Sequence, residues 1–209
     1  NSDSILINIQ SAKSSTSIAG GASHGIYRST DGGNTWTLTN FNPLFVMNFP
    51  FRIQQITYHP LVSNLIFILT TNGLFRSDDN LNTWSLVSTV ISHSSGSFSR
   101  QIEFHPTDPN IIYSHSYSNN GSLHVSNDMG FTFSNISLPL YINRLPLLSV
   151  SKDCPDCLYL ASDNSIWMYQ NNMFNLLDSA FNNFIWGSAI NDLDTSSMIL
   201  GGVNVHSSL

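Results

Sequence analysis

The chain has 209 residues, a formal net charge of −6, and only 10% charged residues. It carries no cluster of Lys and Arg side chains to neutralise phosphates, which argues against nucleic acid as a partner. No apolar run approaches the roughly 20 residues that span a bilayer, so we expect no membrane span in this segment.

Short strands are predicted from the N-terminus onward, and they recur in an order of four that we call A to D. The first unit opens with a strand at residues 5–9. In the second unit, apolar and alternating runs predict four strands. They lie at residues 53–58, 65–69, 74–76 and 83–87. Pro60 ends strand A because proline has no amide hydrogen for a ladder, and Asn72-Gly73 predicts the hairpin between B and C.

The third unit repeats this order, and the fourth retains most of it. Strands are predicted at residues 101–104, 111–113, 122–125 and 131–133, then at 147–150, 158–160 and 166–168. The last loop of the fourth unit, residues 169–174, has lost the Ser and Asp that earlier units carry there. A fifth unit starts at about Phe184 and stops near Val205, before its third strand. No helical period is visible.

One loop motif recurs between strands C and D. Residues 29–36, 77–84 and 126–133 share the pattern Ser-x-Asp-x-x-x-Thr-aromatic, and their starts lie 48 and 49 residues apart. Four-stranded units at this period indicate the antiparallel blades of an all-β propeller. A β-sandwich does not explain the recurring loop, and the coils of a β-solenoid are usually shorter. Blades are expected at approximately residues 4–40, 50–88, 99–137 and 145–178, with a partial blade at 184–205. The unfinished fifth blade predicts a fragment of a larger propeller.

The motif resembles the Asp box, or BNR repeat, which occurs in sialidases, xyloglucan-active glycosidases and VPS10 (sortilin) receptors. The resemblance covers about residues 5–180, and residues 104–133 look most like a VPS10 blade. It implies that the box residues are structural, with the Asp bonding the hairpin backbone and the aromatic side chain packing between strands. These residues are Ser29, Asp31, Gly33, Trp36, Ser77, Asp79, Trp84, Ser126, Asp128, Gly130 and Phe133.

The resemblance to VPS10 receptors implies a non-catalytic propeller that binds a peptide or protein ligand in its tunnel and releases it as pH changes. Arg52, Arg100 and Arg144 lie at or just before the starts of three A strands, so we expect them on the rim opposite the Asp boxes. Arg side chains pair with carboxylates, which makes these three residues candidate ligand contacts. The alternative is that they only solvate loop ends or bond loop carbonyls.

Two other functions remain open: a glycosidase with a carbohydrate substrate, and a purely structural propeller. Glycoside hydrolysis usually needs two carboxyl groups. Glu103 is predicted in the middle of an A strand, and Asp192 and Asp194 are predicted toward the opposite end of the propeller from the rim. The sequence therefore argues against catalysis by this segment alone. A catalytic site shared with blades outside this segment remains an alternative. No cofactor is expected. A calcium site is not expected either, because the boxes lack the Glu of an EF-hand loop.

The two cysteines, Cys154 and Cys157, replace polar residues of the preceding unit at an A–B turn. A zinc site would need further ligands, and a thioredoxin-like site would need a βαβ context. We therefore expect a local disulfide in an oxidising compartment. Asn120 and Asn135 begin N-glycosylation triplets. Together with the family resemblance, these features predict that the chain is located in the secretory lumen or outside the cell.

Overall fold

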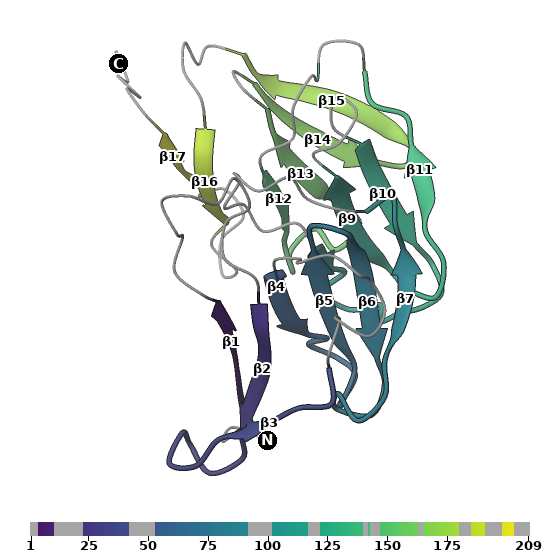
Figure 1. Cartoon of the computed structure of the whole chain (residues 1–209). Helices are drawn as coiled ribbons and strands as arrows, with labels where there is room; N and C mark the ends of the chain where they lie inside the picture. The colour runs from purple at the N-terminus through teal and green to yellow at the C-terminus, as the bar shows by residue number, and fades with distance from the viewer. Residues whose placement is uncertain are drawn as a thin grey trace, which may run out of the picture. The chain divides into compact units, whose positions relative to one another are not determined.

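The computed structural model describes residues 4–10, 23–41, 53–91, 102–116, 122–139, 142, 147–162, 165–179, 185–190 and 198–202. The described part is all-β, and Figure 1 shows its strands grouped into separate antiparallel sheets. It includes no helix of the length and apolarity that crossing a membrane requires. The chain divides into two compact units, Asn1–His59 with Ser63–Ser95, and Pro60–Val62 with Gly96–Leu209.

The first unit contains two sheets. The strands of the first are β1 (Ile5–Gln10), β2 (Ser23–Ser29) and β3 (Thr37–Leu38), in that spatial order. The strands of the second are β4 (Ile53–Tyr58), β5 (Ile66–Thr70), β6 (Gly73–Ser77) and β7 (Ser85–Ser88), again side by side in chain order. All five side chains of β5 are buried, as the continuous apolar run predicts for a strand covered on both faces.

The second unit contains two four-stranded sheets and a hairpin. The third sheet comprises β8 (Ile102–Phe104), β9 (Ile112–Ser116), β10 (Ser122–Ser126) and β11 (Ser134–Ile136). The fourth comprises β12 (Leu147–Val150), β13 (Leu158–Ala161), β14 (Ile166–Gln170) and β15 (Met173–Asp178). The hairpin pairs β16 (Ile185–Ile190) with β17 (Met198–Gly202).

The first sheet differs from the order that its sequence predicts. The strand at the start of the chain was expected to be strand A, yet β1 pairs directly with β2 and so takes the place of strand B. A second difference concerns residues 131–133, which were expected to form a strand. The third sheet's last strand instead begins at Ser134, because hydrogen bonds from Thr132 to Asp128 hold the preceding residues in the loop.

Neighbouring sheets within each unit share a hydrophobic core. In the first unit, Ile26 of the first sheet packs in one cluster with Ile66, Ile68 and Phe75 of the second. Sheets three and four share a second cluster, in which Leu123 packs with residues that include Leu148 and Leu160. Sheets stacked face to face with inner and outer strands in chain order are the blades of a β-propeller.

The A–B turn and the C–D loop lie at the same end of the second blade, and likewise of the third. In the second sheet the amide of Asn80 donates to the carbonyl of Asn64 at 3.1 Å, and in the third the amide of Met129 donates to Asn110 at the same distance. Each bond joins a C–D loop to the A–B turn of its own sheet. The loop motif therefore ties the two connections of a blade together.

The fourth sheet lacks the loop motif and turns more tightly. Asn171 and Asn172 both have positive φ, at 52° and 61°, and connect paired residues Gln170 and Met173. Two consecutive positive φ values identify a two-residue hairpin turn that suits Asn. The outer strand β15 is consequently six residues long, compared with two to four in the other sheets.

Candidate functional site

The three Asp-box loops have one hydrogen-bonding pattern. In the first, the Asp31 carboxylate accepts from the Thr35 amide at 2.9 Å and from its hydroxyl at 2.6 Å, while the Ser29 hydroxyl donates to the same carboxylate at 2.8 Å. The Ser29 oxygen also accepts from the Gly33 amide at 2.8 Å. Asp79 and Asp128 repeat every one of these contacts in their own loops. The box residues therefore satisfy the backbone of their own hairpins.

These hydrogen bonds keep the box carboxylates ionised. The pKa of Asp31 is lowered to about 2, first by the hydroxyl of Thr35 and then by its amide. The pKa of Asp79 is lowered in the same way by Thr83. Burial is the largest influence on Asp128 and opposes the shift, but hydrogen bonds led by Thr132 still lower its pKa. Carboxylates that are ionised and already bonded are poorly suited to act as general acids.

The two residues after each box Asp have left-handed backbone conformations. Gly32 and Gly33 have φ of 70° and 95°, and in the third box Met129 and Gly130 have φ of 56° and 79°. Glycine adopts such values without the steric penalty of a Cβ atom. In the second box, Leu81 occupies the position of Gly33 and Gly130, with φ of 68°, and its buried side chain is part of the first unit's core.

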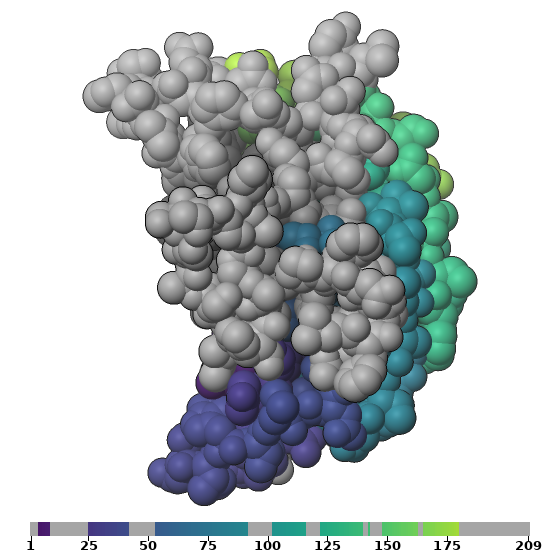
Figure 2. Space-filling view, in the orientation of Figure 1, coloured from purple at the N-terminus to yellow at the C-terminus, as the bar shows by residue number. Residues whose placement is uncertain are grey.

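The aromatic residues of the first two boxes have different surroundings. Trp84 lies 5.0 Å from Phe41 and 5.5 Å from Phe75 by ring centroids, in edge-to-face geometry. Trp36 remains 37% exposed, and its ring nitrogen donates to the carbonyl of Gly33 at 3.0 Å. The first box, in the indigo segment, forms part of the surface in Figure 2. The expected packing between strands therefore holds for Trp84 but not for Trp36.

Replacing Ser126 by Ala is expected to lower the free energy of unfolding by about 1–2 kcal/mol, because the buried Gly130 amide would lose its partner. Chemical denaturation measures this loss. Ser134→Ala is the matched control, since Ser134 is exposed and donates only one long bond, 3.3 Å, to Val125. The control should change stability by no more than about 0.5 kcal/mol. Equal losses in the two variants would contradict the structural role of the box serine.

A disulfide closes the A–B turn of the fourth sheet. Cys154 and Cys157 are bonded with their Cα atoms 5.3 Å apart, and the Cys157 amide donates to the Cys154 carbonyl at 2.9 Å. In the third sheet's A–B turn, the Ile111 amide donates to the Asp108 carbonyl at 3.3 Å, and the Asp108 carboxylate accepts from Asn110. The disulfide thus closes the turn that hydrogen bonds close in the neighbouring blade.

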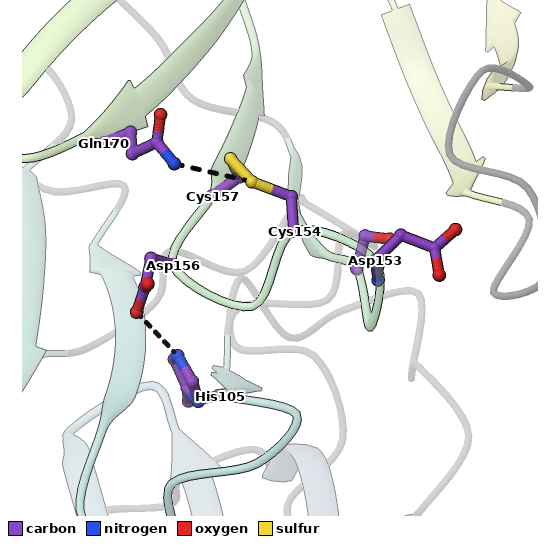
Figure 3. Close-up of a disulfide and its surroundings, with 7 residues drawn as sticks. His105, Asp153, Cys154, Asp156, Cys157 and Gln170 are labelled. Carbon is purple, nitrogen blue, oxygen red and sulfur yellow. Dashed lines mark hydrogen bonds and ion pairs between the residues drawn. A yellow bond between two sulfur atoms is a disulfide. The ribbon is translucent and has the colours of Figure 1, made fainter.

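The disulfide turn reaches the preceding blade through one side chain. Asp156, between the cysteines, lies 3.4 Å from Nε2 of the buried His105, as Figure 3 shows. The other ring nitrogen, Nδ1, accepts the amides of Asp108 at 2.9 Å and Thr107 at 3.3 Å. Because Nδ1 is an acceptor, Nε2 carries the proton and donates to Asp156. His105 therefore orders its own turn and links it to the next blade.

A row of polar side chains crosses the third sheet, and the sequence analysis did not identify it. Ser114 of β9, His124 of β10 and Asn135 of β11 are direct cross-strand neighbours. Ser114 and His124 are buried, and the Ser122 hydroxyl lies 2.8 Å from Nε2 of His124. Burial lowers the pKa of His124 because desolvation disfavours the imidazolium. A polar residue alternating within a strand normally faces solvent, so the pattern offered no sign of this burial.

The buried His124 should make folding sensitive to mild acid. Its pKa is lower in the folded chain than the usual value of about 6.5, so its contribution to stability is present above that pH and is lost as the pH falls below it. Between about pH 7 and about pH 5, unfolding free energy should decrease more in the unmodified protein than in a His124→Gln variant. Denaturation series at several pH values measure this. The other histidines are common to both proteins, so parallel pH profiles would contradict the assignment.

The structure does not describe the three predicted rim arginines: Arg52, Arg100 and Arg144 lie outside the described residues. Of the acidic alternatives, Glu103 lies within β8, while Asp192 and Asp194 also fall outside. Within the described ranges, no group of three or more His, Cys, Asp or Glu side chains could hold a metal ion. The arrangement that is described is a scaffold of hairpins, a disulfide turn and buried polar residues.

Residues 24–138 match the model of the Sortilin-Vps10 family, described as sortilin, neurotensin receptor 3. This match covers more than half of the chain and includes two complete four-stranded sheets. No curated protein sequence is significantly similar to the chain.

Among solved structures, the chain is similar to the GH74 xyloglucanase from Xanthomonas campestris, at 14% identity and a TM-score of 0.68, over all of this chain and 34% of that one. A GH74 enzyme from Niastella koreensis matches at 20% identity and a TM-score of 0.67, over 96% of this chain and 32% of that one. The structure of YCF48 bound to D1 peptide matches at 13% identity and a TM-score of 0.58, over 87% of this chain and 56% of that one. At these identities the likeness concerns the fold, and the chain spans about a third of the length of these two GH74 structures.

Proposed function

The chain belongs to the Sortilin-Vps10 family, and from that premise we propose that it is a ligand-binding segment of a sorting-receptor propeller. The observation that carries the proposal is the family match over residues 24–138, which coincides with blades whose Asp boxes are engaged in structural hydrogen bonds. Because these carboxylates are committed to the fold, we assign them no catalytic role. We further propose that the chain forms part of a larger ring, to which the expected blades at residues 4–40, 50–88, 99–137, 145–178 and 184–205 contribute.

The proposed ligand is a peptide or a protein. YCF48, whose structure contains the D1 peptide, has a similar fold over 87% of this chain, which supports peptide binding by this architecture. The proposed compartment is the secretory lumen or the cell exterior. The disulfide supports this location, because such bonds persist in oxidising compartments.

The proposed ligand contacts are Arg52, Arg100 and Arg144. In sequence they come just before β4, β8 and β12, the first strands of three blades, whereas the A–B turns follow those strands. Arginines contributed by successive blades can converge on one anionic group, and a guanidinium pairs with a carboxylate through two parallel hydrogen bonds. A peptide carboxylate is therefore the chemical group that this rim would recognise.

Replacing Arg52 and Arg100 together by Ala is expected to weaken binding of neurotensin, the peptide in the family's description, by about tenfold or more in the full-length protein. Calorimetry or surface plasmon resonance measures the affinity. Lys152→Ala is the matched control, because it removes an exposed cation from the A–B turn at the opposite end of a blade. Amidating the peptide carboxylate should lower the affinity of the peptide for the unmodified protein. It should not lower further the affinity for the double variant. Unchanged binding by the double variant would overturn the rim site.

The glycosidase alternative remains because GH74 structures share the fold over the whole chain. It predicts that the full-length protein hydrolyses xyloglucan, and such activity would replace the receptor proposal. The purely structural alternative predicts that the full-length protein binds no peptide at all.

A further inference from the structure

We propose that Asn135 is a site of N-glycosylation, with the glycan attached to the outer edge strand of the third blade. This inference rests on the secretory route in the proposed function. It concerns β11, which among the described strands is the last in the order of its sheet and pairs only with β10. The green atoms of this part of the chain lie on the surface in Figure 2.

The acceptor triplet begins in β11 and ends at Ser137, directly after the strand. Asn135 and Ser137 are exposed, whereas Ile136 between them is half-buried and packs against the core of the second unit. Successive side chains of a strand point to opposite faces, so Asn135 lies on the other face of β11 from Ile136, in the row that it shares with His124, and there its own side chain is exposed. Ser137 follows β11 and is exposed as well. The two groups that the transferase must recognise, the amide and the hydroxyl, are thus compatible with an attached oligosaccharide after folding.

The amide of Asn135 is also not committed to the fold. Other asparagines in the described chain use their Nδ2 atoms to hold loops: Asn34 donates to the carbonyl of Asp31 at 2.7 Å, Asn82 to Asp79 at 2.7 Å, and Asn110 to its neighbour Asp108 at 2.9 Å. Among the described residues, the Asn135 side chain has no hydrogen-bond partner. Glycosylating Nδ2 at this position removes no bond that the described structure depends on.

The strand environment gives the modification a physical benefit. A free sheet edge presents unpaired amides and carbonyls that can recruit another chain, and proteins protect such edges with charge, proline or coverage. β11 has the sequence Ser-Asn-Ile, with none of these protections in the strand itself. A bulky, hydrated glycan on its central residue would hinder pairing by another strand.

The chemical step needs a donor from the secretory membrane, an oligosaccharide linked through a diphosphate to a polyisoprenoid lipid. Nδ2 of Asn135 attacks C1 of the first sugar, and a new C1–N bond forms. The bond between C1 and the phosphate oxygen breaks, the lipid diphosphate leaves with the electron pair, and Nδ2 releases one proton. The transfer occurs on the entering chain, so the folded structure has only to accommodate the product.

The second triplet provides a contrast within the same protein. Asn120 lies outside the described residues, and the hydroxyl of its partner Ser122 lies 2.8 Å from Nε2 of the buried His124. Ser122 is half-buried and engaged with that histidine, whereas Ser137 is exposed. An Asn120→Gln variant removes the second triplet and leaves Asn135 as the residue under test.

The test expresses the full-length protein, with Asn120→Gln as background, in a eukaryotic secretory host. Removing N-glycans enzymatically should shift its mobility on a gel, and peptide mass spectrometry should find Asn135 converted to Asp. Asn135→Gln and Ser137→Ala should each abolish that shift. Ser137→Thr is the matched control, since it keeps the acceptor pattern and should retain the glycan.

Two negative outcomes are distinguishable by assaying the thiols in the same sample. A secreted protein that contains the Cys154–Cys157 disulfide but carries no glycan on Asn135 would overturn the glycosylation site and leave the secretory route intact. A full-length protein that stays in the cytosol with both thiols free would overturn the route, and the glycosylation site with it. A glycan retained by Ser137→Ala would also contradict the assignment.

Discussion

A Gly73→Ala variant is expected to lose roughly 3 kcal/mol of unfolding free energy, the largest effect predicted for a single substitution in this chain. Gly73 begins β6 with φ of 150°, and a Cβ atom there would lie 2.5 Å from the carbonyl oxygen of Ser88 and 2.9 Å from Cδ1 of Leu86. Ser88 pairs with Leu74 in the same ladder, so its carbonyl cannot retreat without disturbing the pairing of β6 with β7.

Gly32→Ala is the control for the Gly73 variant. Gly32 also has positive φ, 70°, but a Cβ atom at that position would meet no atom within 4 Å. Its substitution tests backbone conformation without the collision and should cost about 1 kcal/mol. Urea denaturation of both variants measures the difference. Equal losses would show that the close approach to Ser88 is not what requires glycine.

Replacing Cys154 and Cys157 together by Ser is expected to lower unfolding free energy by about 2 kcal/mol, the value that the loop-entropy model assigns to so short a ring. For a chain of this size the midpoint of thermal unfolding should fall by roughly 4–8 °C. The same change should loosen the contact of Asp156 with His105, because the turn that presents Asp156 would no longer be closed covalently.

The control for the disulfide is chemical reduction. A reductant that leaves the fold otherwise untouched should lower the melting temperature of the unmodified protein to that of the double variant. It should not change the melting temperature of the double variant, which has no other cysteine. A reductant-insensitive midpoint in the unmodified protein would contradict a stabilising disulfide.

Much of the fold could be predicted because the Asp box and the strand signals are local. Residues 53–58 and 147–150 form strands with the predicted bounds. The prediction of a strand at residues 131–133 was wrong. Aromatic residues and Thr favour strands, and nothing in that local pattern reveals that Asp128 holds Thr132 in a loop. The fourth blade was correctly described as lacking the box, but its tight turn at Asn171–Asn172 depends on backbone angles.

The candidate site was only partly accessible from sequence. The box residues and the cysteines could be identified because each side chain acts on atoms a few positions away. The burial of His124 and Ser114 could not be predicted, because burial depends on the packing of the whole folded chain and not on the local residue order. The proposed rim arginines remain a prediction, since they lie outside the described residues.

The sequence alone determined the blade architecture, because a repeat with constant spacing specifies the same hairpins each time and each hairpin is stabilised within itself. Only the tertiary structure decided which strand occupies each place in the first sheet, which turn the fourth sheet adopts, and that the side chain of Asp156 lies against His105 of the preceding blade. The physical reason is range: hydrogen bonds within a loop follow from local residue order, whereas pairing and packing between segments depend on contacts that form only when the chain is folded.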